Sequence, residues 1–170
     1  FKQNSNLFWL SGIDQEDSYL LIYPDCPVPE YREALFLKQT NEHIAVWEGY
    51  KYTKEDARAT SGVAYIYWNN DFESNLRPII NMASNIYLDL NENDRFSYRS
   101  PYKAMDFAHE MQQKFPLHHY ERTGTILQRL RSIKSEIELD MIRKAVSISK
   151  KGFERILKFI KPGVWEHEVE

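Results

Sequence analysis

The sequence contains a single cysteine, Cys26, so no disulfide can form within the chain. It contains no apolar run of about 18 residues, the length that a membrane-spanning helix requires, and no hydrophobic signal segment. These two absences predict a protein of a reducing compartment, the cytoplasm, with no membrane partner.

Strong charge of one sign is also missing. The 22 basic and 25 acidic residues give a formal net charge of -3 and are spread along the chain. Because binding to a phosphate backbone requires clustered basic side chains, nucleic acid is not an expected partner. The sequence also lacks a glycine-rich phosphate loop and a nucleophile elbow, which removes two common classes of enzyme site.

The residues that are present can build one hydrophobic core, since 42% of the 170 residues are hydrophobic and 14% are aromatic. Apolar runs alternate with helical patterns, which predicts an α/β or α+β arrangement with helices covering a sheet. We expect strands over residues 7–10, 19–23, 34–37, 63–68 and 86–88, and helices over 54–59, 71–82 and 100–114.

Several of these helices carry end signals. Thr53 is typical of an N-cap and Gly62 of a terminating turn. Asp71 is a second candidate cap, although Pro78 inside its helix predicts either a kink or a different boundary. Ser100-Pro101 places a cap residue before a proline at the first helical position, and Pro116 ends that helix.

The final helix has the clearest local pattern. Ser135 and Glu138 have the spacing of a capping box, and apolar residues between 137 and 160 recur at helical spacing until Pro162-Gly163. A change of composition near residues 123–132 separates this helical segment from the α/β region. We therefore predict one domain over residues 1–124 and a second segment over 125–170.

Few residues suggest catalytic chemistry. His118-His119 and His167 lack further ligands at metal-binding spacing. We therefore expect His118 and His119 to face solvent or lie in a turn, and His167 to lie at the start of an amphipathic helix. His109-Glu110 fits the charged face of a surface helix. Cys26 follows an acidic residue, which does not favour a reactive thiolate. From the residues alone, these motifs support only an α/β domain.

An aromatic segment is more suggestive of binding. Residues 47–52, WEGYKY, place three large rings and a glycine between a predicted strand and a helix, where loops often form a binding edge. The alternative is that Trp47 packs in the core, as large aromatic side chains mostly do.

Two motifs resemble one family. FKQNSNLFWLSGI at residues 1–13, followed by the Trp-x-Gly element at Trp47, is similar to the opening of aminopeptidase P proteins. LRSIKSEIE at 130–138, with IRKA at 142–145 and IKPGV at 160–164, is similar to the entry into the "pita-bread" catalytic domain of the aminopeptidase P, prolidase and creatinase relatives. Together these matches bracket nearly the whole chain.

The resemblance implies a creatinase-like N-terminal domain, with a mixed β-sheet flanked by helices, and a long C-terminal helix that begins the pita-bread domain. In that family two metal ions, usually Mn²⁺, activate a hydroxide that cleaves the peptide bond before a penultimate proline. The five ligands would lie beyond Glu170, so no residue of this chain is predicted to bind a metal or to be catalytic. The family also implies a homo-oligomer in which Trp47 lies at the substrate edge or contacts a neighbouring subunit.

The chain starts at Phe1 and stops at Glu170 within a predicted helix, so we expect a piece of a longer protein that is inactive by itself. Two alternatives stay open. The resemblance implies a Xaa-Pro aminopeptidase as the parent protein; the alternatives are a prolidase acting on dipeptides, and a non-catalytic assembly or interaction module that kept the fold without the metal ligands.

Overall fold

The computed structural model describes residues 3–41, 46–90 and 102–169. The chain divides into two compact units, Phe1–Thr125 and Ile126–Glu170. Each unit is described by itself below.

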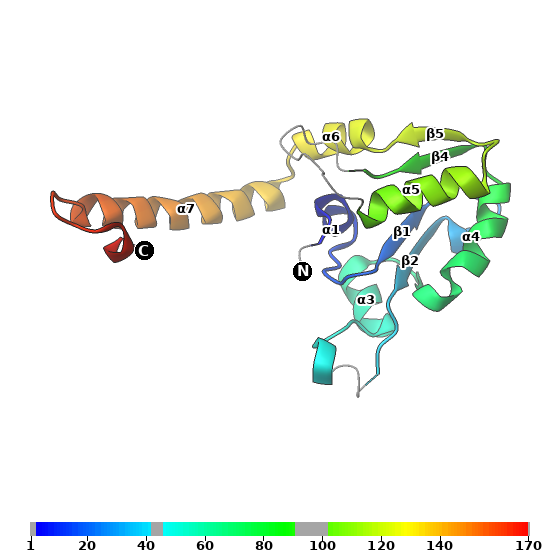
Figure 1. The fold of residues 1–170 in the computed structure, drawn as a ribbon, viewed down its shortest axis with the longest axis horizontal. Helices are drawn as coiled ribbons and strands as arrows, with labels where there is room; N and C mark the ends of the chain where they lie inside the picture. The colour runs from blue at the N-terminus through cyan, green and yellow to red at the C-terminus, as the bar shows by residue number, and fades with distance from the viewer. Residues whose placement is uncertain (1–2, 42–45, 91–101, 170) are drawn as a thin grey trace. The chain divides into compact units, whose positions relative to one another are not determined.

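The first unit contains two groups of strands (Figure 1). In the larger sheet, β1 (Tyr19–Ile22) pairs antiparallel with β2 (Glu33–Leu37), and β2 pairs parallel with β3 (Tyr65–Trp68). A second, two-stranded sheet joins β4 (Asn85–Leu88) and β5 (His119–Arg122) in parallel. The described strands therefore form mixed and parallel pairings, as the sequence analysis expects.

The central strand β2 is buried on both faces. Leu35 and Leu37 belong to a core cluster that includes Ala57 of α3 (Lys54–Ser61). Phe36 points to the opposite face, since side chains alternate along a strand, and packs edge to face on Phe72, with ring centroids 5.0 Å apart. Phe72 is the first residue of α4 (Phe72–Asn81), so helices cover both faces of β2.

The first predicted strand is wrong, because residues 7–10 belong to a helix, α1 (Ser5–Ser11). The Asn4 side-chain oxygen accepts hydrogen bonds from the backbone N–H groups of Asn6 and Leu7, at 2.8 and 3.0 Å. Gly12 ends the helix with a positive φ of 69° and donates its N–H to the Phe8 carbonyl. These two caps, rather than the apolar run between them, decide the local structure.

The expected caps of α3 are confirmed. The Thr53 hydroxyl accepts the Asp56 N–H at 3.1 Å, and Gly62 closes the helix with φ of 74°. The cap expected of Asp71 is wrong, since its side chain makes no capping hydrogen bond to α4. Pro78 lies inside α4 without ending it, at an exposed position where water can reach the carbonyl that lost its donor.

The helix expected after residue 100 is α5 (Lys103–Lys114), with Tyr102 at its N-cap and Pro116 just beyond its end. The expected cap at Ser100-Pro101 lies outside the described residues. Both α4 and α5 contribute aromatic residues that pack on Tyr19 of β1.

Helix α6 (Gly124–Ser132) spans the division between the units, and the second unit contains α7 (Glu136–Phe159). The predicted capping box of α7 is confirmed, with both Ser135 and Glu138 bonded reciprocally. Its apolar side chains are exposed, among them Ile137 at 78%. His167 lies in a short 3-10 turn (Glu166–Glu168) instead of an α-helix start. No described helix has the length and apolarity needed to cross a membrane.

Replacing Asn4 by Ala should lower the free energy of unfolding of the first unit by about 1 kcal/mol, because two backbone N–H groups lose their acceptor. Asn4→Asp should be nearly neutral, since a carboxylate caps a helix equally well. Urea denaturation followed by circular dichroism measures both variants. Equal stability of the Ala and Asp variants would contradict the capping role.

Candidate functional site

Trp47 lies at the surface and not in the core. It belongs to a short helical turn at residues 46–48, and 81% of its surface is exposed. Tyr50 is also exposed, whereas Tyr52 packs against the core cluster. The alternative interpretation of Trp47 as a core residue is therefore wrong.

The segment that carries Trp47 leaves β2 after Leu37 and returns at residues 51–52, and Gln15 joins its two ends. The Gln15 side-chain amide donates to the Lys38 carbonyl at 3.2 Å, and its oxygen accepts the Tyr52 N–H at 2.8 Å. Gln15 is only 2% exposed, so these two bonds satisfy an amide that water hardly reaches. The ends of the segment are thus held together from inside the domain.

An ion-pair network also links the residues at the two ends of the segment that carries Trp47. Lys51 is only 8% exposed, and its ammonium donates a short hydrogen bond to the Glu16 carboxylate. Lys38 lies 3.8 Å from Glu16 and pairs with Glu48, the neighbour of Trp47, at 2.6 Å. The hydrogen bond from Lys51 lowers the pKa of Glu16 below its usual value, with a smaller opposing effect of burial.

A second set of contacts joins the segment to α3. The Tyr50 hydroxyl donates to the Asp56 carboxylate at 2.8 Å, and its ring lies edge to face on Tyr52 with centroids 5.7 Å apart. Hydrogen bonds from Thr53 and Tyr50 lower the pKa of Asp56. The site that results is a supported, exposed aromatic edge suited to binding rather than to acid–base chemistry.

The predicted histidines do not come together with other metal ligands. His118 places Nε2 3.0 Å from the Ile80 carbonyl, and His119 begins β5. Glu110, beside His109, pairs with Lys114 at 2.5 Å. Within residues 3–41, 46–90 and 102–169, no three His, Cys, Asp or Glu side chains are grouped as metal ligands. Cys26 is fully buried.

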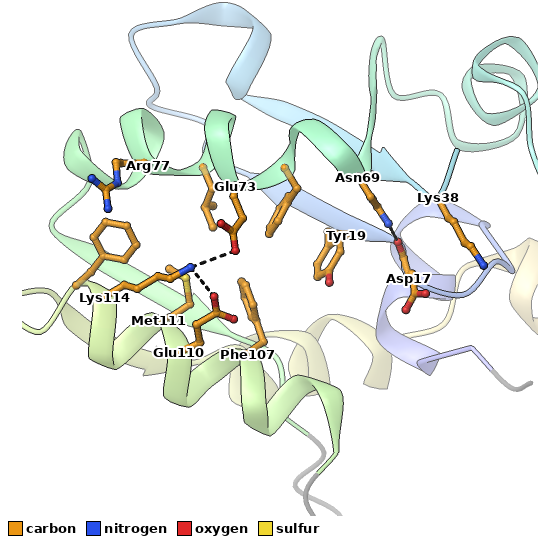
Figure 2. Close-up of a pocket in the computed structure, with 13 residues that line it drawn as sticks. Asp17, Tyr19, Lys38, Asn69, Glu73, Arg77, Phe107, Glu110, Met111 and Lys114 are labelled. Carbon is orange, nitrogen blue, oxygen red and sulfur yellow. Dashed lines mark hydrogen bonds and ion pairs between the residues drawn. The ribbon is translucent and has the colours of Figure 1, made fainter. Parts of the chain in front are cut away.

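Sequence reasoning identified Trp47 but missed the residues that support it. Gln15, Glu16 and Lys51 are separated from each other by up to 36 positions and follow no motif. The polar pair Gln15–Glu16, shortly before β1, was a signal that could have pointed to them. The sequence reasoning also missed a groove between α4 and α5, which only the packing of these helices creates (Figure 2).

Comparison with known proteins gives a family and a fold. The family model described as "Aminopeptidase P, N-terminal domain" matches residues 1–87. Intermediate cleaving peptidase 55 of Schizosaccharomyces pombe is 26% identical over 169 residues, covering 93% of this chain and 32% of the relative. Human Xaa-Pro aminopeptidase 3 is 23% identical over 155 residues, covering 90% of this chain and 30% of the relative. The chain thus spans about a third of the length of these relatives.

Among solved structures, a Bacillus anthracis protein assigned as an aminopeptidase P superposes with a TM-score of 0.87 at 23% identity, covering 99% of this chain and 40% of that one. At this identity the likeness establishes the fold alone. It confirms the mixed α/β arrangement with flanking helices.

Replacing Glu16 by Gln should lower the free energy of unfolding by about 2 kcal/mol near neutral pH, because Lys51 is left buried without an ionised partner. The folded-state pKa of Glu16 is lowered, so its contribution is complete above the usual value of 4.5 and is lost as pH falls through the folded-state pKa. Urea denaturation at several pH values measures the difference. Glu121→Gln, an exposed carboxylate on β5, is the matched control. A cost for Glu16→Gln that stays constant down to strongly acidic pH would refute the pairing.

Proposed function

The chain belongs to the family of aminopeptidase P N-terminal domains, and on this premise we propose that it is the accessory domain of a dinuclear-metal Xaa-Pro aminopeptidase. Such an enzyme removes the N-terminal residue from peptides that carry proline in second position. Relatives of the chain bear the names Xaa-Pro aminopeptidase and peptidase, and the sequence alignments with these relatives cover nearly all of this chain. The family match is the observation that carries the proposal.

The described residues do not fit a pair of divalent metal ions. Such a centre needs several carboxylates and a histidine converging on one point, and no such group exists within the described ranges. We therefore derive no catalytic step from this chain. The proposal assigns the Mn²⁺ ions and the hydrolysis to another part of the parent protein, and the inactivity of this chain alone follows from that assignment.

The proposed contribution of this domain is oligomer contact and control of substrate access through Trp47. A largely exposed indole on a segment whose ends are held by Gln15 supports this proposal, because exposed tryptophans are frequent anchor residues at interfaces. Penultimate-proline peptides are the proposed substrates, and a second copy of the chain is the proposed partner.

The first test is release of the N-terminal residue from an Xaa-Pro-Yaa tripeptide. The full-length protein with Mn²⁺ should be active and should lose activity with a chelator, while residues 1–170 alone should be inactive. Hydrolysis of Xaa-Pro dipeptides in preference to tripeptides would favour the prolidase alternative. Lack of both activity and bound metal in the full-length protein would favour the assembly module.

Trp47→Ala in the full-length protein should raise KM for peptides of five or more residues by about tenfold, or dissociate the oligomer, and leave kcat for a tripeptide nearly unchanged. Tyr87→Ala, which removes another exposed aromatic side chain of the first unit, is the matched control. Steady-state kinetics and light scattering measure the two effects. Unchanged KM together with an unchanged oligomer mass would exclude Trp47 from both roles.

A further inference from the structure

The Gln15 side chain makes opposite kinds of hydrogen bond to the two ends of the segment that carries Trp47. It donates to the Lys38 carbonyl and accepts the Tyr52 N–H. A carboxylate can only accept and an ammonium can only donate, whereas an amide does both within one planar group. The residue type at position 15 is therefore matched to this link, and its burial keeps water from replacing either bond.

Lys38 connects this link to Trp47. Its carbonyl is bound by Gln15, and its ammonium pairs with Glu48 at 2.6 Å. Glu48 directly follows Trp47 in the short helical turn at residues 46–48. Two successive contacts thus lead from the buried amide to the residue beside the exposed indole.

Gln15 is itself held by the opening of the chain. The Gln3 side-chain amide donates to the Gln15 carbonyl at 2.7 Å, and the Ser18 hydroxyl donates to the same carbonyl at 2.8 Å. Gln3 belongs to the opening motif and Trp47 to the Trp-x-Gly element, the two features that the sequence analysis compared with the start of aminopeptidase P proteins. In the folded chain, Gln15 connects these two elements.

We propose that Gln15 is a positioning residue for Trp47. It holds both ends of the segment, with Gln3 as its own support, and thereby sets where the indole meets a peptide or a neighbouring subunit. This inference rests on the contact role proposed for Trp47 above. It adds that the role depends on a buried amide that meets neither substrate nor partner, as supporting residues beneath a binding site commonly do.

The main variant is Gln15→Met in the full-length protein. Methionine is an unbranched side chain of similar length, but it removes both the donor and the acceptor of the amide. Ser61→Ala is the matched control in the same unit, because the Ser61 hydroxyl also makes one donated and one accepted bond, to the Ala57 carbonyl at 2.7 Å and from the Val63 N–H at 3.1 Å.

Gln3→Ala is the second variant, and it keeps the proposal testable if Gln15→Met does not fold. Gln3 is half-buried and lies outside the core cluster, so its replacement should be tolerated. It removes the hydrogen bond to the Gln15 carbonyl without changing the Gln15 amide. Its effects should have the same direction as those of Gln15→Met and be smaller.

The first measurement needs no enzymatic activity. The full-length protein is labelled with 5-fluorotryptophan, and the ¹⁹F resonance of Trp47 is assigned with Trp47→Phe. We expect Gln15→Met to shift or broaden this resonance and Ser61→Ala to leave it unchanged. A Trp47 resonance that Gln15→Met does not alter, or that Ser61→Ala alters equally, would overturn the inference.

The second measurement is a double-variant comparison of steady-state kinetics. Gln15→Met should raise KM for peptides of five or more residues by about tenfold, as expected for Trp47→Ala, with a much smaller change in kcat for a tripeptide. The double variant should be no worse than Trp47→Ala alone, because Gln15 acts through Trp47. Additive effects on KM would overturn the inference. If Trp47→Ala changes the oligomer mass instead, light scattering makes the same comparison.

The two measurements separate this inference from the proposed function. A full-length protein without peptidase activity, in which Gln15→Met still alters the Trp47 resonance, would reject the proposed function and support the positioning role. An active aminopeptidase whose Trp47 resonance is the same with and without Gln15→Met would support the proposed function and reject the positioning role.

Discussion

Strand β2 has to bury both of its faces, and the arrangement of the first unit depends on this requirement. Leu35 and Leu37 pack toward Ala57 of α3, while Phe36 packs on Phe72 at the start of α4. A strand with apolar side chains on both faces is stable only when cover is present on each side. The position of α3 on one face and of α4 on the other follows from the side-chain alternation of a single four-residue run, 34–37, which is buried throughout.

Burial of β2 also fixes where the proposed site begins. The chain leaves the sheet at Leu37 and packs against the core again at Tyr52, so the residues next to these two positions form the base of the intervening segment. Gln15 and Glu16, which precede β1, reach both ends of that base through two amide hydrogen bonds and the pairing with Lys51. This buried polar clamp holds both ends of the segment that carries Trp47, which supports the substrate-access or subunit-contact role proposed for that residue.

The wrong prediction of a strand at residues 7–10 shows a limit of assigning secondary structure from a short apolar pattern. A four-residue apolar run is compatible with either a strand or a helix, and its aromatic content favoured a strand. The flanking Asn4 and Gly12 were stronger signals, because one satisfies two free N–H groups and the other adopts the positive φ that ends a helix. Thr53, Gly62 and the Ser135–Glu138 box were recognised for this same reason, and the helices they bound were predicted correctly.

The sequence by itself determined the features that depend on neighbouring residues: the caps of α3 and α7, the buried strand β2, and the family, through motifs spaced along the chain. Only the tertiary structure decided that Trp47 is exposed, that Gln15 joins Lys38 to Tyr52, and that α4 and α5 line an aromatic groove. The physical reason is sequence separation. Caps and strand periodicity are short-range interactions that a sequence displays directly, whereas buried polar clamps and grooves arise where distant segments meet, and their members carry no shared pattern.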